Sequence, residues 1–290
     1  MMGKEKIKPG HKQMNKMMQY LVLCILLLLA LLWLYPYIWV TIASVKNETD
    51  ITGSGLLPSK PMTLGHYKFI LSTAAEIGRT PFGRAFFNSF FISSTVTVFV
   101  ILIGGLAGYS LAKHEFPGRK FLTNFIIFQM LFPTILFLVP VFLVIKNLHM
   151  IDTYQGMILP FVASAWAVFL FYQFFKGIPN DLIESVRIDG GRELLIIFRI
   201  MFPLSKPIIT IIGMFIFMQR WDEYLWYIVL NKKNAFMPMT NLLAGYMKSY
   251  GENLGAQMAG VIFLTFPIIV LFIIFRKSFT RGITMTGLKG

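Results

Sequence analysis

The sequence predicts an all-α, polytopic membrane protein with six transmembrane helices, and three observations support this fold class. Hydrophobic residues make up 56% of the 290 residues, charged residues only 14%, and the mean hydropathy is +0.66. The apolar residues form long runs, and about 20 such residues cross about 30 Å of hydrocarbon. Lysines and arginines cluster between the runs, which is typical of topology signals and argues against nucleic-acid binding despite a net charge of +14.

The first apolar run is too long for the core of a signal peptide and lacks a small-residue cleavage site, so we expect it to be retained as a membrane helix. The two termini and the connections on the same side of the membrane as the termini hold roughly twice as many lysines and arginines as the connections on the other side. Because such residues are enriched in cytoplasmic segments, this predicts that both termini are cytoplasmic. The six predicted spans cover residues 17–45, 86–112, 121–145, 156–175, 206–230 and 256–275. The predicted organisation is a cytoplasmic tail (1–16), the first span (17–45), an extracytoplasmic loop (46–85), a five-span core (86–275) with a cytoplasmic loop (176–207), and a cytoplasmic tail (276–290).

The loop 46–85 is rich in Gly, Pro, Ser and Thr, with a short helix predicted near residues 66–72. The loop is either a solvated connector or a docking surface for an external partner. The second span carries Gly104, Gly105 and Gly108, a small-residue face that lets helices approach closely in lipid. Prolines within the later spans indicate kinked packing or a substrate path, and the sequence leaves both open; they are Pro133, Pro140, Pro160 and Pro267.

The fifth span contains the polar run Gln219-Arg220-Trp221-Asp222-Glu223 near its middle. Charges at that depth cost at least about 3 kcal/mol unless they face protein or water. Gln219 and Arg220 lie four and three residues before Glu223, so local pairing on a helix is expected. Two interpretations stay open, an internal ion pair that locks this span to its neighbours and a lining of the translocation path.

The cytoplasmic stretch 176–207 is much longer than a connection between two spans requires, and long loops with their own structure are usually functional. Its polar start offers Asn180 or Asp181 as a helix cap, and Gly190-Gly191 is expected to end the helix. A second amphipathic run follows and closes at Pro203 and Pro207.

Several kinds of chemistry have no motif in the sequence. No phosphate-binding loop or nucleophile elbow occurs, and the four histidines are scattered over four connections without metal-ligand spacing. The single Cys24 cannot form an internal disulfide. We therefore do not expect an enzyme. No duplicated half is detectable, which argues against a self-sufficient transporter built from inverted repeats.

The stretch 176–207 resembles the cytoplasmic signature loop of ATP-binding-cassette (ABC) importer permeases. That signature is Glu-Ala-Ala, three residues, Gly, nine residues, Ile-x-Leu-Pro, and this chain has Glu184-Ser185-Val186, Gly190 and Ile200 to Pro203 at those spacings. The departures are Ser185 and Val186 for the alanines and Phe202 for the leucine. Arg187-Ile188-Asp189-Gly190 is similar to the sugar-importer branch.

Other stretches extend the resemblance over nearly the whole chain. Residues 109–113 with 116–120 look like the end of the second span and its basic turn, and Leu159-Pro160 with 169–175 look like the fourth span. Trp221 to Leu225 resembles a Trp-Asn-Glu/Asp-aromatic-Leu element, with Asp222 where asparagine is usual. The tail 281–290 is similar to that of the shorter permease chain of maltose-type and multiple-sugar importers.

The resemblance implies a type I ABC importer permease fold in a bacterial cytoplasmic membrane. It implies a heterodimer with a second, homologous permease chain, two ATPase domains that bind ATP and Mg, and an extracytoplasmic solute-binding protein. This chain would bind no cofactor and, apart from lipids, contact only these partners, with no nucleic acid.

The resemblance also implies that a coupling helix inserts into an ATPase cleft, with Leu182, Ile183 and Val186 as its apolar ridge and Glu184 and Arg187 as charged contacts. The alternative is an amphipathic helix lying on lipid headgroups. The implied ATPase-coupling residues are Asn180, Asp181, Leu182, Ile183, Glu184, Ser185, Val186, Arg187, Asp189, Gly190 and Gly191.

The function implied is ATP-driven import of a carbohydrate, a mono- or oligosaccharide. Aromatic and polar groups of the fifth span would suit sugar faces and hydroxyls, and the candidate path residues are Gln219, Arg220, Trp221, Asp222, Glu223 and Trp226. The alternatives are an ABC permease for a different organic solute, and a stand-alone carrier or membrane scaffold.

Overall fold

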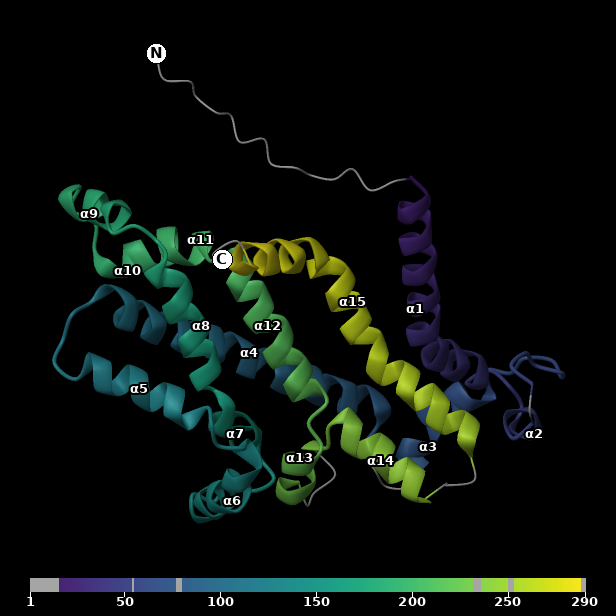
Figure 1. Cartoon of the computed structure of the whole chain (residues 1–290). Helices are drawn as coiled ribbons and strands as arrows, with labels where there is room; N and C mark the ends of the chain where they lie inside the picture. Colours follow the sequence, from purple (N-terminus) through teal and green to yellow (C-terminus); the bar gives the residue numbers. More distant parts are fainter. Residues whose placement is uncertain (1–15, 54, 77–79, 232–235, 250–252, 288–290) are drawn as a thin grey trace.

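The computed structural model describes residues 16–53, 55–76, 80–231, 236–249 and 253–287, and every regular element in these ranges is a helix (Figure 1). All but the last residue of the predicted N-terminal tail 1–16 lies outside the described residues, as do residues 288–290 of the predicted C-terminal tail. The all-α prediction is confirmed for the part of the chain that is described.

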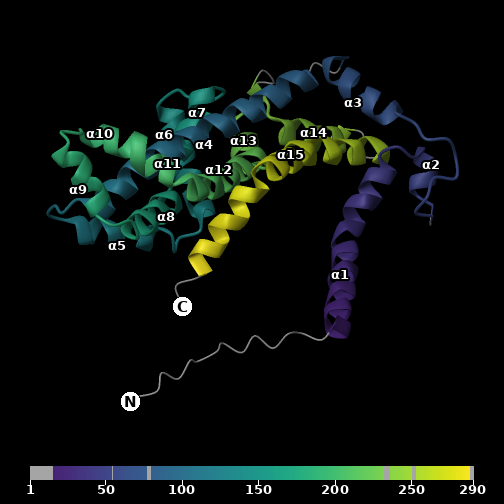
Figure 2. The same cartoon turned by 90° about the horizontal axis from the view of Figure 1, so that it is seen from above.

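Helix α1 (Lys16–Ala43) stands apart from the other helices along most of its length (Figures 1 and 2). Its side chains are exposed almost throughout, and only its C-terminal end approaches the rest of the chain, where Ser44 Oγ lies 2.8 Å from Tyr67 Oη. An apolar helix of this length with no buried face suits lipid on all sides.

A small second core joins segments from both ends of the chain. It contains α3 (Gly65–Glu76), the first turn of α4 (Phe82–Lys113), α14 (Met239–Ser249) and the first turns of α15 (Leu254–Gly287), with the short α2 (Glu48–Ile51) beside them. The short helix predicted near 66–72 is therefore confirmed and is longer than expected. The buried residues of this core are Ile70, Phe82, Ala85, Met239, Leu242, Leu243, Tyr246, Ala256 and Ala259.

The main core is organised on α4 (Phe82–Lys113), an unbroken helix that runs from the α3 end of the molecule to the end that holds α9 (Figures 1 and 2). Helix α8 (Ala165–Lys176) packs on its glycine face. A Cβ added at Gly104 would lie 3.2 Å from Ala167 Cβ, and one added at Gly108 would lie 2.5 Å from Phe171 Cβ. The predicted close helix contact is therefore confirmed.

Three of the six predicted spans are not straight helices. Within the described residues, only α1, α4 and α15 are single helices long and apolar enough to cross a membrane, and the count reaches six only if each of three bent pairs is one span. Helix α5 (Arg119–Gln129) meets η1 (Thr134–Phe137) and α6 (Leu138–Asn147) at 97°. A single straight helix over 121–145 is therefore the wrong description, and Pro133 lies at the break.

The other two bent pairs also contain proline. Helices α7 (Tyr154–Ile158) and η2 (Leu159–Phe161) meet α8 at 42°. The run Glu193–Leu204 meets α12 (Lys206–Trp221) at 80°; it comprises α10 (Glu193–Ile196), the π-helical η3 (Ile197–Met201) and α11 (Phe202–Leu204).

The fifth predicted span is interrupted near its C-terminal end, and the helix of the sixth extends beyond the predicted span 256–275 into the predicted tail. Helix α12 stops at Trp221 and α13 (Leu225–Leu230) begins after a break, so the span predicted as 206–230 is interrupted at 222–224. Helix α15 continues to Gly287 rather than ending near residue 275.

The contact between α4 and α8 gives the first testable prediction. We expect Gly108→Ala to lower the stability of the protein by about 1–3 kcal/mol, because the new methyl group would meet Phe171 Cβ at 2.5 Å and the backbone nitrogen of Tyr172 at 2.9 Å. Gly83→Ala is the matched control, since nothing lies within 4 Å of its added Cβ on the same helix. Thermal unfolding in detergent measures both, and an equal effect of the two substitutions would contradict the close contact.

Candidate functional site

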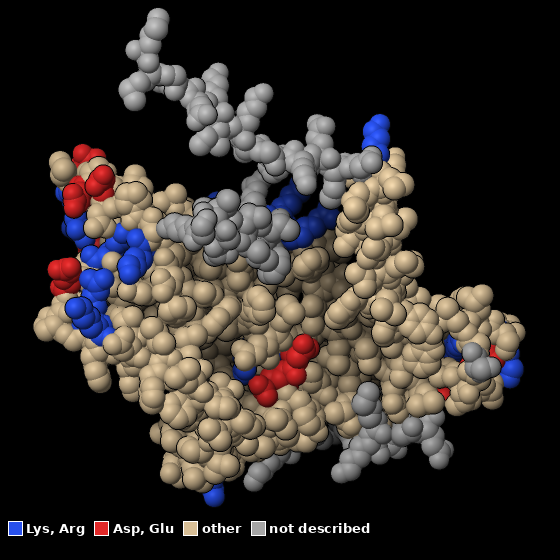
Figure 3. All heavy atoms as spheres, in the orientation of Figure 1, with Lys and Arg blue, Asp and Glu red and all other residues tan. Residues whose placement is uncertain are grey.

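Helix α9 (Asp181–Ile188) projects at one end of the molecule, where charged side chains of both signs gather (Figures 1 and 3). Ile183 is buried and Val186 packs against the main core. Leu182 and Ile188 are exposed, Ile188 to 85%. The predicted apolar ridge of Leu182, Ile183 and Val186 is therefore wrong in part, because the latter two residues anchor the helix and the outward apolar side chains are Leu182 and Ile188.

The start of α9 is fixed by α4 rather than by a side-chain cap. The Asn180 side chain makes no capping bond; its Oδ1 accepts a hydrogen bond from Lys113 Nζ at 2.8 Å, and Lys113 Nζ also donates to the carbonyl of Ile178. The predicted cap at Asn180 is corrected accordingly. Asp181 and Glu184 lie in the first turn, where negative charge is favourable.

The end of α9 is a Schellman motif built on the glycine pair. The Gly191 N–H donates to the Val186 carbonyl at 2.8 Å and the Gly190 N–H donates to the Arg187 carbonyl at 3.0 Å. Gly190 has φ +78°, a conformation that favours glycine. The predicted helix end is confirmed. A Cβ at Gly191 would lie 2.5 Å from Val186 Cγ1, so the bulk of Val186, where the signature has alanine, is accommodated within this chain.

Glu193 of α10 contacts side chains of α4 and α9. It was not predicted from the sequence as a site residue. Its Oε1 accepts a hydrogen bond from Arg187 Nε at 3.0 Å, and its Oε2 accepts one from the Tyr109 hydroxyl at 2.7 Å. His114 Nε2 lies 3.8 Å from the same Oε2. The hydrogen bond to Glu193 raises the pKa of Arg187. Arg187 thus pairs within its own chain while its side chain stays 43% exposed, and its predicted role as a charged contact with a partner stays a prediction.

The remaining residues of the predicted coupling set lie on the exposed side of this segment. Asp181, Glu184, Ser185, Asp189 and Gly190 are exposed. The exposed Leu194 and Phe198 continue the outward surface beyond the glycine turn. The surface formed by α9 and the start of the next run is therefore mixed, with apolar side chains among acidic ones, which is common for a protein contact.

The predicted polar run of the fifth span lies at the break between α12 and α13. Arg220 Nη2 pairs with Glu223 Oε2 at 3.2 Å, and the guanidinium lies 3.9 Å from the centre of the Phe161 ring. Glu223 Oε1 also accepts a hydrogen bond from the Trp226 N–H at 3.1 Å. The predicted local pairing of Arg220 with Glu223 is confirmed. Among the described residues, Arg220 Nη1 has no hydrogen-bond partner.

Both tryptophans of the predicted path are buried in the protein. Trp221 Nε1 donates to the Leu264 carbonyl at 2.9 Å, and Trp226 Nε1 donates to the Gly156 carbonyl at 3.3 Å. They hold α12 and α13 against other helices, so they do not line an open surface in this conformation. Gln219 and Asp222 are exposed, and Figure 3 shows a patch of acidic atoms near the end of α12 with basic atoms beside it.

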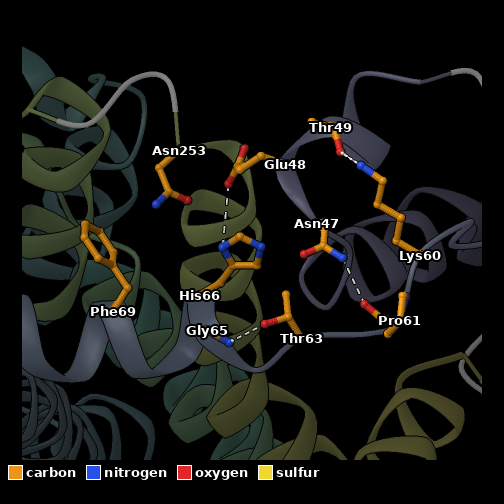
Figure 4. Close-up of a pocket in the computed structure, with 10 residues that line it drawn as sticks. All are labelled: Asn47, Glu48, Thr49, Lys60, Pro61, Thr63, Gly65, His66, Phe69 and Asn253. Atoms are coloured by element: carbon orange, nitrogen blue, oxygen red, sulfur yellow. Dashed lines mark hydrogen bonds and ion pairs between the residues drawn. The ribbon is translucent and has the colours of Figure 1, made fainter.

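A cavity of about 610 Å³ lies on the opposite end of the molecule, between α2, α3 and the start of α15 (Figure 4). Glu48 accepts hydrogen bonds from the N–H groups of Leu254 at 3.2 Å and Gly255 at 2.9 Å, and lies 3.6 Å from His66 Nδ1. These contacts fasten the first loop to α15. The lining residues are Asn47, Glu48, Thr49, Lys60, Pro61, Thr63, Gly65, His66, Phe69 and Asn253.

Comparisons with known proteins agree with this architecture. The chain is 32% identical over 267 residues to the arabinooligosaccharides transport system permease protein AraQ of Bacillus subtilis (strain 168), covering 91% of this chain and 93% of that protein. It is 28% identical to the diacetylchitobiose uptake system permease protein NgcG of Streptomyces coelicolor, with coverages of 90% and 85%.

A solved structure shares the fold. It is a bacterial ABC transporter involved in the import of the acidic polysaccharide alginate, and it matches with a TM-score of 0.78 and 22% identity over 94% of this chain and 100% of that chain. Residues 100–285 match the family described as the binding-protein-dependent transport system inner membrane component. The chain therefore belongs to this family, the multi-pass permease subunits of ABC importers.

Proposed function

We propose that the chain is the shorter permease subunit of an importer that carries a neutral mono- or oligosaccharide across a bacterial cytoplasmic membrane. The observation that carries the proposal is α9, a short helix fixed to the core by Ile183 and Val186 while Leu182 and Ile188 face outward. The names of relatives, which give arabinooligosaccharides and diacetylchitobiose, support a carbohydrate cargo.

The proposed topology has six spans with both termini in the cytoplasm. The spans are α1, α4, α15, the bent pairs α5–α6 and α7–α8, and α12 with α13, while the run Glu193–Leu204 before α12 belongs to the cytoplasmic loop. The predicted boundaries are kept, namely tails at 1–16 and 276–290, an extracytoplasmic loop at 46–85, and a core at 86–275 with its cytoplasmic loop at 176–207. Helices α4 and α15 both run from the end with α2 and α3 toward the end with α9, which supports this assignment (Figures 1 and 2).

In the proposed assembly this chain pairs with a second, homologous permease chain. Two ATPase domains bind ATP and Mg below the pair, and α9 inserts into one of them. Leu182 and Ile188 supply the apolar contact, while Asp181, Glu184 and Asp189 supply hydrogen-bond acceptors. Closure of the ATPases moves α9 as a rigid body and opens the transporter outward, and hydrolysis resets it.

The extracytoplasmic side receives the substrate from a solute-binding protein. The cavity lined by Glu48, Lys60 and His66 supports a docking surface there, because α2 and α3 are fastened to the first turn of α15 rather than forming a loose connector. Among the predicted path residues, Gln219 and Asp222 are the ones proposed to face the substrate. Glu223 is neutralised by Arg220, so Asp222 sets the charge of this surface.

Reconstitution tests the proposed function. We expect uptake of arabinotriose or another saccharide into proteoliposomes only when this chain is combined with the second permease, the ATPases, the solute-binding protein and ATP. A thermal-shift screen of the binding protein against mono- and oligosaccharides selects the cargo. Uptake by this chain alone without ATP would contradict the proposal and favour a stand-alone carrier.

The docking surface on α9 is tested by Ile188→Glu. Because Ile188 is 85% exposed, folding should change by less than about 0.5 kcal/mol. Binding to the ATPase should weaken roughly tenfold or more, since a charge enters an apolar contact. Leu57→Glu is the control, a similarly exposed residue in the first loop. Co-purification with the ATPase measures both, and equal recovery of the two variants would rule out this surface.

The charge at the break is tested by Asp222→Asn. Removing the carboxylate should raise uptake of an anionic saccharide relative to a neutral one of the same length by roughly tenfold, because like charges repel strongly at low solvent content. Glu115→Gln is the control, since Glu115 is almost fully exposed in the turn between α4 and α5. Relative uptake rates measure the effect, and an unchanged ratio would remove Asp222 from the substrate path.

A further inference from the structure

Helix α4 holds both ends of α9. Tyr109 and Lys113 lie one turn apart on α4, so they share a face of the helix. Lys113 binds the segment before α9 through the Ile178 carbonyl and Asn180 Oδ1, and Tyr109 reaches the far end of α9 through Glu193. These hydrogen bonds link both ends of α9 to α4.

The contacts of Glu193 bridge the glycine turn that follows α9. The turn after α9 consists of Gly190 and Gly191, and glycine restricts backbone motion less than any other residue. Arg187 before the turn and Glu193 after it form a charge-assisted pair across it. The Tyr109 hydroxyl then fixes the same carboxylate to α4, and the Tyr109 side chain is buried in the main core.

The opposite end of α4 is tied to the extracytoplasmic segment that leads into α14. Ser89 Oγ accepts a hydrogen bond from the Met239 N–H at 2.8 Å, and Asn88 Nδ2 donates to the Met237 carbonyl at 3.1 Å. The Tyr154 hydroxyl donates to Asn88 Oδ1 at 2.6 Å. Between these ties α4 contains no proline and no break, so it can move as one body.

We propose that α4 is the rod that carries the motion of α9 to the extracytoplasmic segment before α14, and that Glu193 is the positioning residue that fastens α9 to this rod. Glu193 acts through Arg187 and Tyr109 and touches neither substrate nor nucleotide. The inference rests on the proposed docking of α9 to an ATPase, and it assigns transmission to the second span.

The experiment places a reporter at the far end of the rod in the assembled importer. Met237→Cys in a Cys24→Ser background provides one thiol, and its reaction rate with a membrane-impermeant maleimide is measured with and without ATP plus vanadate. We expect a several-fold nucleotide-dependent change in the parent. Glu193→Gln should abolish this change while the ATPase still co-purifies, and Tyr109→Phe, which keeps the ring, should reduce it. Glu115→Gln is the matched control on the same side of the molecule and should behave as the parent.

The outcomes separate this inference from the proposed function. If the parent does not co-purify with an ATPase, the docking of α9 is wrong. If it does, and Glu193→Gln together with Tyr109→Phe keeps the full nucleotide-dependent change, Glu193 does not fasten α9 to α4. A parent that binds the ATPase and hydrolyses ATP but shows no change at Met237→Cys overturns the role of α4 as the rod.

Discussion

The close packing of α4 against α8 is the contact on which the rest of the structure depends. At Gly108 the two helices are so close that a methyl group would overlap Phe171 and the backbone of Tyr172. Helix α8 continues within a few residues into α9, so the position of α9 follows from this contact. Small residues allow such contacts in membranes, where the hydrophobic effect does not drive helices together and van der Waals packing does.

The bends in the other spans have a common physical requirement. A break in a helix frees backbone groups, and in an apolar environment each must find a partner. At the break between α12 and α13, Thr240 Oγ1 donates to the Glu223 carbonyl at 2.9 Å and Asn241 Nδ2 donates to the Tyr224 carbonyl at 3.4 Å. The polar side chains of α14 thus satisfy backbone carbonyls at the interruption between α12 and α13, and they link it to α14.

Hydropathy predicted the long single helices α1 and α4 well, but it did not predict where the other spans bend. The bounds of α1 and α4 agree with the sequence to within a few residues, because length and apolar content decide them. Hydropathy did not predict the 97° bend between α5 and α6, because hydropathy carries no information about the direction of the chain. The signature spacing located α9 and its glycine end. It could not reveal Glu193, whose partner Tyr109 is 84 residues away, although the charge pair Arg187 and Glu193 across two glycines was a local signal.

The adjacent carboxylates Asp222 and Glu223 differ in their surroundings because Arg220 pairs with only one of them, Glu223. Arg220 lies on the buried side of α12, so it can pair with the residue three positions later, and Glu223 is drawn inward with it. Asp222 is the first residue of the break after α12 and is exposed, and among the described residues no cation pairs with it. A carboxylate facing lipid at that depth would cost at least about 3 kcal/mol. The exposed face at the break therefore suits contact with water or protein better than contact with hydrocarbon.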